Sequence, residues 1–217
     1  ILASGAPTEP GRFQTLRAED GCPMVTGQAQ QDRCWGKIGR AAIARDFGHW
    51  LSLMPKKLGH TFDHESFPIE YVREADPGAW NEGRRVAGRG LLTLFHRLLL
   101  SAAALGVTGV AAYRRRDRRP WIAQMLALGL VLALTLWGFV DIDHPFYPLA
   151  ILIPVIAALR LPGRPPQGPV GRYLIGLLAA TSLTHAIFFG DDRYHVVVTP
   201  VLCLLAAAAL RSRDRIG

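Results

Sequence analysis

Several motifs that define common enzyme classes are missing from this sequence. It contains no Walker phosphate-binding loop, no GxGxxG fingerprint, no CxxC pair and no nucleophile motif. No basic face interleaved with aromatic residues is visible either, so nucleic acid is not an expected partner. Cysteine is scarce, with three residues in a chain of 217. Nucleotide hydrolases, dinucleotide-dependent enzymes and dithiol oxidoreductases therefore have no support.

Acidic residues are also few, and the two parts of the chain differ in charge. Residues 1–90 contain 12 Lys and Arg against 11 Asp and Glu, whereas residues 91–217 contain 13 against 6. The formal net charge of +8 therefore arises almost entirely in the second part. That part is also the more apolar one, in a chain whose residues are 50% hydrophobic. Excess basic charge among apolar segments is typical of a membrane protein with basic cytoplasmic loops.

Five apolar segments follow residue 90. They cover residues 91–113, 121–140, 145–161, 173–189 and 194–210. A transmembrane helix needs roughly 20 residues, with about 17 as a practical minimum. The first two segments qualify outright, the next two are marginal, and the last reaches the minimum only because Tyr194 and His195 extend it beyond residues 196–210. All five are apolar on every side, which argues against a soluble helical bundle. The sequence predicts an all-α integral membrane protein with about five transmembrane helices (residues 91–217), preceded by an exported loop region (residues 1–90).

Charged residues between the spans predict their orientation. Arginines gather at 114–119, 160–172 and 211–215, whereas the alternate loops contain the acidic stretches 141–144 and 191–193. The positive-inside rule makes the arginine side cytoplasmic. Residues 1–90 are therefore expected outside and the C-terminus in the cytoplasm.

The exported region is expected to contain one amphipathic helix. Asp32 is predicted to cap this helix, which bends or restarts at Pro55. Lys56 and Lys57 are expected at the lipid headgroups of the membrane surface. Packing of the helix on the rest of a soluble loop domain is the open alternative. Residues 61–90 are interpreted as an ordered but irregular connector, with turns at 67–68 and 76–78.

Two of the three cysteines lie in the exported region. Cys22 and Cys34 are predicted to form a disulfide, because an oxidising compartment lets such a bond persist. A polar stretch of about 90 residues ahead of the first span needs an upstream signal to cross the membrane. The chain opens Ile1-Leu2-Ala3-Ser4 without one. We therefore expect it to be the C-terminal part of a longer membrane protein.

The hinge between the last two apolar segments is the main candidate site. It contains Asp191, Asp192, Arg193, Tyr194 and His195. An arginine at headgroup depth can pair with phosphate oxygens in a low dielectric, and an interfacial tyrosine can turn its hydroxyl toward the phosphate. Pairing of Arg193 with Asp191 or Asp192, which would simply cap the hinge, is the open alternative.

Other ionisable residues carry weaker predictions. Asp63, His64 and Glu65 invite a metal interpretation, but adjacent residues do not converge on one ion without help. A solvated turn is preferred there, and no metal ligand is assigned. His96 and Arg97 lie about six residues inside the first span, where ionisable groups are costly. They are expected to face the bundle or to reach outward, with a partner in the preceding part of the protein.

Three stretches carry a resemblance to a known family. They are the helix ending Met54-Pro55-Lys56-Lys57-Leu58 with Phe62, the closing Phe188-Phe189-Gly190…Arg193-Tyr194-His195…Pro200…Leu205-Ala206-Ala207, and the opening Gly5-Ala6-Pro7-Thr8…Gly11-Arg12-Phe13. They resemble the C-terminal half of the bacterial C-type membrane glycosyltransferases, relatives of protein O-mannosyltransferases and of the lipid A aminoarabinose transferase.

The resemblance implies a function and a location. Such enzymes transfer a sugar from a polyprenyl-phosphate carrier to an acceptor on the outer face of the bacterial inner membrane. The acidic residue that they use as catalytic base lies in their first exported loop, which would precede Ile1, so no catalytic residue is expected in this chain. Whether the full-length enzyme uses a divalent metal is left open. A non-enzymatic membrane scaffold and a transporter fragment are the alternatives, although the internal repeats typical of transporters are not visible.

Overall fold

A computed structural model describes residues 27–109, 118–140, 146–159, 169–188 and 190–210. These residues fold into helices, and none of them forms a β-strand, which confirms the predicted all-α class. In chain order the helices are α1 (Gln28–Arg45), α2 (Phe47–Ser52), α3 (Met54–Phe62), α4 (Phe67–Ala75), α5 (Glu82–Thr108), α6 (Arg118–Val140), α7 (Tyr147–Ala158), α8 (Pro169–Ile187), the 3₁₀-helix η3 (Asp192–Val198) and α9 (Thr199–Leu210).

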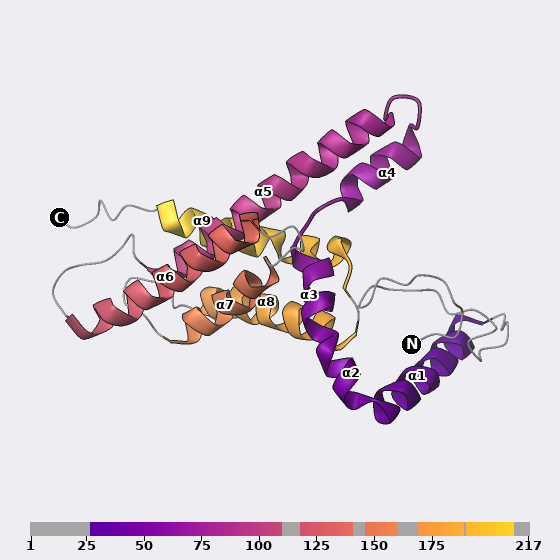
Figure 1. Ribbon diagram of the computed structural model, residues 1–217, viewed down its shortest axis with the longest axis horizontal. Helices are drawn as coiled ribbons and strands as arrows, with labels where there is room; N and C mark the ends of the chain where they lie inside the picture. The colour runs from indigo at the N-terminus through magenta and orange to yellow at the C-terminus, as the bar shows by residue number, and fades with distance from the viewer. Residues whose placement is uncertain (1–26, 110–117, 141–145, 160–168, 189, 211–217) are drawn as a thin grey trace.

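The predicted amphipathic helix is three helices, arranged as a bent arm beside the bundle (Figure 1). The start predicted at Asp32 is wrong, since α1 begins at Gln28. A break at Asp46 separates α1 from α2, and the Asp46 side chain accepts a hydrogen bond from the His49 N–H. The predicted restart at Pro55 is confirmed, because this proline lies in the first turn of α3, where its missing N–H costs nothing.

The connector predicted for residues 61–90 is largely helical. Phe67-Pro68 starts α4 instead of forming a turn, with the proline again in the first helical turn. The turn predicted at residues 76–78 is present, and Asn81 caps α5 by accepting a hydrogen bond from the Arg84 N–H. Helix α5 then continues through residue 90, the boundary predicted between the exported and membrane regions.

Three helices among the described residues are long and apolar enough to cross a membrane: Glu82–Thr108, Trp121–Val140 and Pro169–Ile187. Helices α7 and α9 are equally apolar but have 12 residues each, below the length that a straight span needs. The 3₁₀-helix η3 precedes α9 directly and lengthens that segment. The chain is therefore an all-α membrane protein, and the number of five spans stays a prediction.

The apolar core lies where α5 packs against α9 and α7. Leu100, Ala103, Ala104 and Val107 recur at helical spacing on one face of α5 and are buried. The two alanines let the neighbouring backbone approach closely, as small residues do between membrane helices. Phe62 at the end of α3 is fully buried in the same core, so residues before 90 are part of it.

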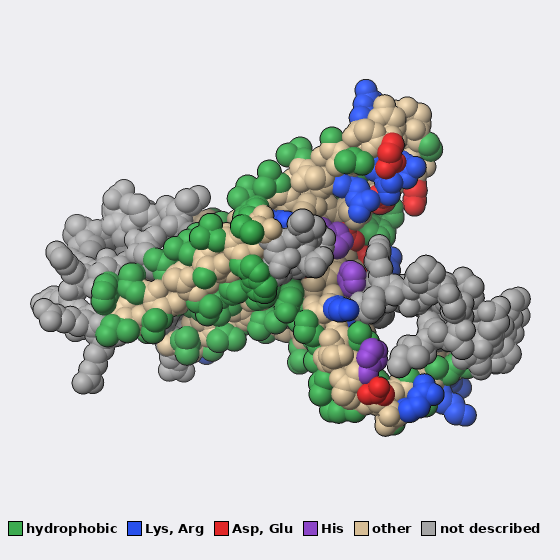
Figure 2. Space-filling view, in the orientation of Figure 1, with side chains coloured by type: hydrophobic (Ala, Val, Ile, Leu, Met, Phe, Trp, Pro, Cys, Tyr) green, Lys and Arg blue, Asp and Glu red, His purple; other side chains and the backbone are tan. Residues whose placement is uncertain are grey.

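Most large apolar side chains of helix α6 are exposed, unlike those on the buried face of α5. Leu126 is 70% exposed and Leu136 is 68% exposed. Figure 2 shows hydrophobic side chains covering this part of the molecule, whereas charged ones gather near α1–α2 and α4–α5. An apolar surface of this extent suits contact with lipid. Most of the arginines at 114–119, 160–172 and 211–215 and the acidic stretch 141–144 lie outside the described residues, so the orientation stays a prediction.

Candidate functional site

Buried polar side chains collect at one end of the core, where the end of α3, the α3–α4 connection, α5 and η3 meet. We call this group the polar junction; its members are Thr61, Asp63, Glu65, Ser66, His96, Asp191, Asp192 and His195. All except Glu65 are buried, and Glu65 is partly buried. Polar groups are costly to bury unless each finds a partner, so their bonding indicates what the junction does.

The hinge reaches the junction through a close contact with α3. Gly190 lies so near this helix that a Cβ would overlap the carbonyl oxygen of Lys57. Asp191 then caps η3 by accepting a hydrogen bond from the Arg193 N–H at 3.3 Å. Burial raises the pKa of the Asp191 carboxyl, with the adjacent Asp192 acting in the same direction.

The 3₁₀ geometry divides the predicted site residues between two faces. A 3₁₀-helix has three residues per turn, so residues at i and i+3 share a face. Asp192, His195 and Val198 are the buried residues of η3 and lie at this spacing. Arg193 and Tyr194 fall between them and are partly exposed. The five residues predicted to bind a lipid phosphate therefore do not act as one group.

Asp192 serves the structure rather than a ligand. Its Oδ2 accepts hydrogen bonds from the Ser66 N–H at 2.6 Å, the Ser66 hydroxyl at 2.5 Å and the Phe67 N–H at 3.2 Å. These are donors at the N-terminus of α4, so Asp192 caps a helix 126 residues away in sequence. Burial alone would raise the pKa of Asp192, but the bonds from Ser66 hold it below its usual range. The prediction that Asp192 contacts phosphate does not fit this geometry.

Arg193 and Tyr194 form the exposed part of the hinge. The Arg193 guanidinium donates to the Tyr194 hydroxyl at 3.0 Å and lies over the rings of Phe67 and Tyr194, with centroid distances of 5.1 and 4.9 Å. Its ion pair with Asp191 is long, at 3.8 Å, and its side chain is 39% exposed. Capping of the hinge and an accessible guanidinium, posed as alternatives by the sequence, are both present.

Asp63 and Arg97 connect the junction to α7 and α5. Asp63 accepts a hydrogen bond from the Tyr147 N–H at 2.8 Å, at the start of α7. Burial raises the pKa of Asp63 to about 8, although the N–H groups of Tyr147 and Phe146 oppose the shift. The Arg97 guanidinium donates to the backbone oxygen of Asp63 at 2.9 Å. Arg97 therefore has a partner within this chain.

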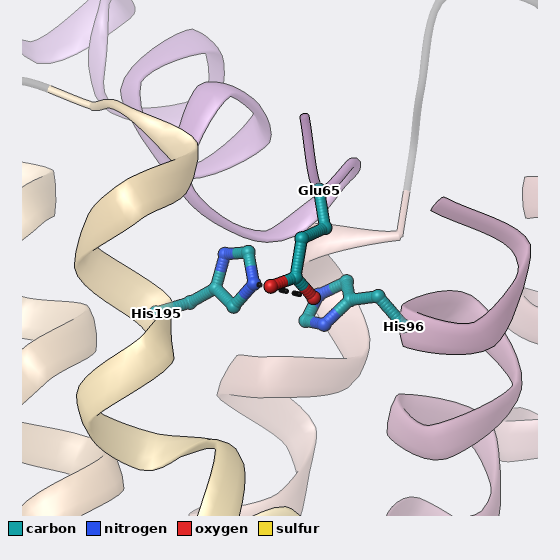
Figure 3. A group of neighbouring side chains, drawn as sticks. All are labelled: Glu65, His96 and His195. Atoms are coloured by element: carbon teal, nitrogen blue, oxygen red, sulfur yellow. Dashed lines mark ion pairs between the residues drawn. The ribbon is translucent and has the colours of Figure 1, made fainter. Parts of the chain in front are cut away.

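His96 and His195 lie in the centre of the junction, with Glu65 beside them (Figure 3). The two imidazole rings are 4.0 Å apart between centroids. His96 Nε2 is hydrogen-bonded to the carbonyl oxygen of Phe62 at 2.9 Å, and His195 Nδ1 to that of Thr61 at 2.6 Å. His195 Nε2 faces Glu65 Oε2 at 3.5 Å. His195, predicted with the other hinge residues to belong to the phosphate site, is fully buried.

The sequence identified only part of this arrangement. The cost of an ionisable residue inside a span pointed to His96, but its partner is a backbone carbonyl, which carries no sequence signal. Glu65 was set aside because its sequence neighbours cannot converge with it, and the convergence comes from α5 and η3 instead.

One of the two predicted membrane-surface lysines is not at a surface. Lys56 is exposed, but Lys57 is buried and donates from Nζ to the Ile187 carbonyl oxygen at 3.0 Å, in the last turn of α8. Its ammonium group also lies 5.1 Å from the ring centroid of Trp50. Burial lowers the pKa of Lys57. Cys34 lies on α1 and is disulfide-bonded, as predicted, whereas Cys203 is free. Its predicted partner, Cys22, lies outside the described residues.

We expect Lys57→Met to lower the stability of the protein in detergent by about 1–2 kcal/mol, because it removes the partly buried hydrogen bond from the Lys57 ammonium group to the Ile187 carbonyl oxygen. The measurement is the midpoint of thermal unfolding. Lys56→Met is the matched control, since it removes an exposed lysine from the preceding position of the same helix. Equal midpoints for the two variants would contradict the buried role of Lys57.

Comparisons with known proteins identify no relative: no family model, no curated protein and no solved structure matches the chain.

Proposed function

We propose that the chain is the C-terminal part of a membrane glycosyltransferase that transfers a sugar from a polyprenyl-phosphate carrier to an acceptor on the outer face of a bacterial inner membrane. The observation that carries the proposal is the placement of Arg193, an accessible guanidinium at the end of a bundle of apolar helices. The resemblance of the closing stretch to C-type glycosyltransferases supports the same conclusion.

The surroundings of Arg193 suit a lipid-linked phosphate. The rings of Phe67 and Tyr194 hold the guanidinium in place while leaving part of it open to solvent. The nearest carboxylate, Asp191, is 3.8 Å away and leaves the positive charge available. A guanidinium can make two parallel hydrogen bonds to phosphate oxygens. The apolar helices beside it offer a surface along which a prenyl tail can lie.

The residues of the hinge would have two different roles in the enzyme. Arg193 and Tyr194 would bind the phosphate, whereas Asp192 and His195 would hold η3 against α3 and α4. The acidic residue that acts as catalytic base would come from a segment preceding this chain. At this site the chain would contact the carrier phosphate of the donor, and no residue here is assigned to the sugar itself.

We expect Arg193→Ala to weaken binding of undecaprenyl phosphate at least about tenfold, because a hydrogen bond to a charged group contributes ~1.5–3 kcal/mol. Arg193→Lys should recover only part of this affinity, since an ammonium cannot form the bidentate pair. The measurement is a titration of the detergent-solubilised chain. In the protein carrying its preceding segments, Arg193→Ala should reduce sugar transfer by a similar factor.

Arg89→Ala is the matched control. Arg89 is about as exposed as Arg193 and also pairs with a carboxylate, Glu70, but lies on α5 away from the hinge. Its replacement should leave binding unchanged. Undecaprenol, which lacks the phosphate, should bind equally weakly to the wild type and to Arg193→Ala. A wild type that does not distinguish the phosphate from the alcohol would refute the proposal and favour a scaffold role.

A further inference from the structure

Three side chains with metal-ligating atoms converge in the polar junction from three separate segments. Glu65 comes from the α3–α4 connection, His96 from α5 and His195 from η3. One ligand atom of each lies within 4.8 Å of the others. Figure 3 shows the carboxylate between the two imidazole rings. Residues 65 and 195 are far apart in sequence, so the grouping is a product of the fold.

Hydrogen bonding leaves one nitrogen of each ring without a partner. A carbonyl oxygen can only accept, so His96 Nε2 and His195 Nδ1 carry the hydrogens in their bonds to Phe62 and Thr61. In a neutral imidazole the second nitrogen then has a lone pair. Those nitrogens, His96 Nδ1 and His195 Nε2, are buried and make no hydrogen bond, although His195 Nε2 faces Glu65 Oε2 at 3.5 Å. Unsatisfied buried acceptors of this kind are rare and call for an explanation.

The hydrogen bonds from the two imidazoles to backbone carbonyl oxygens are of the kind that accompanies metal ligation. A histidine that binds a metal usually donates its other ring N–H to a backbone carbonyl or carboxylate, which fixes the tautomer and the ring orientation. Both rings here are fixed in this way, by the carbonyls of two consecutive residues at the end of α3. The partly buried Glu65 supplies the negative charge that a buried cation requires.

We propose that Glu65, His96 and His195 bind a divalent transition-metal ion, with Zn²⁺ as the best fit. Two imidazoles and one carboxylate suit Zn²⁺, whereas Mg²⁺ and Ca²⁺ prefer ligand sets made of oxygen. Around a tetrahedral Zn²⁺, ligand atoms are separated by about 3.4 Å. The 3.5 Å between His195 Nε2 and Glu65 Oε2 matches this separation.

The site has a structural consequence that is independent of the proposed lipid substrate. The ion would cross-link the α3–α4 connection, α5 and η3, and would therefore fix the hinge that presents Arg193. Three protein ligands leave a coordination position open, as in zinc sites that bind a water or a substrate atom.

The test measures zinc binding by the full chain, purified in detergent with a tag that contains no histidine and stripped with a chelator. We expect one Zn²⁺ per chain by calorimetric titration, a higher thermal unfolding midpoint with Zn²⁺ but not with Mg²⁺, and visible absorption bands with Co²⁺. Glu65→Gln keeps the side-chain shape but is a poor ligand, so it should bind Zn²⁺ at least about tenfold more weakly. His195→Asn should do the same.

Glu74→Gln and His49→Gln are the matched controls, because they remove an exposed residue of the same type away from the junction. Both should bind Zn²⁺ as the wild type does. Equal affinity of Glu65→Gln and Glu74→Gln would overturn the proposal. If the junction variants do not fold, the measurements on the wild type test the proposal by themselves. A wild type that shows neither Co²⁺ absorption bands nor a higher unfolding midpoint with Zn²⁺ would overturn the metal site. His195 and Glu65 would then form only an ion pair.

Discussion

Gly190→Ala is expected to lower the thermal unfolding midpoint of the protein in detergent by about 6–12 °C. The added Cβ would overlap the Lys57 carbonyl oxygen and lie 2.7 Å from the Lys57 carbonyl carbon and 2.9 Å from the His60 Cβ. Overpacking usually costs about 1–3 kcal/mol, and a chain of this size loses about 2–4 °C per kcal/mol. The upper end applies because two of the opposing atoms are backbone, which cannot escape by changing rotamer.

The added methyl group of Gly190→Ala should also disturb the polar junction. The hinge and α3 would have to move apart, which would stretch the hydrogen bond from His195 Nδ1 to the Thr61 carbonyl oxygen. Gly176→Ala is the matched control, because its Cβ would meet no heavy atom within 4 Å. In a helix interior such a change should be neutral or stabilising by up to ~1 kcal/mol. Equal midpoints for the two variants would show that α3 and the hinge are not in close contact.

The sequence predicted the features that depend on neighbouring residues. Uninterrupted apolar runs predicted helices at residues 121–140 and 173–189, and the structure has α6 and α8 there. Pro55 marked a helix restart because a proline without an N–H fits the first turn. Asp32 was a misleading cap signal. The helix begins one turn earlier, and the N-cap residue is Gly27, which offers no side-chain oxygen.

The features that depend on distant residues were not predictable. Helix α4 was missed because Phe67-Pro68 was interpreted as a turn, although a proline also fits the first turn of a helix. The carboxylate that caps α4 comes from Asp192, far away in the sequence. The sequence placed all five polar residues of the hinge in one candidate site. Only the 3₁₀ period turns Asp192 and His195 inward and leaves Arg193 and Tyr194 outside. A segment of seven residues is too short for that period to show in the sequence.

Asp192→Ala is expected to destabilise the protein by about 3–5 kcal/mol, because three donors at the start of α4 would lose one shared acceptor in a buried environment. Loss of the negative charge at the N-terminus of α4 adds to this effect. Asp76→Ala is the matched control: Asp76 accepts a single hydrogen bond, from the Ala79 N–H, in an exposed turn. Its loss should cost about 1 kcal/mol or less.

The dependence on pH separates charge from shape at the same position. The pKa of Asp192 is below its usual range in the folded protein, so its charge adds stability above the unfolded pKa of about 3.9. That stability is lost as the pH falls through the lower folded pKa. The wild type should therefore exceed Asp192→Asn in unfolding midpoint at pH 7, and the difference should shrink as the pH falls from about 5 to 3. A difference that stays constant over this range would mean that the acceptor geometry, and not the carboxylate charge, holds the hinge to α4.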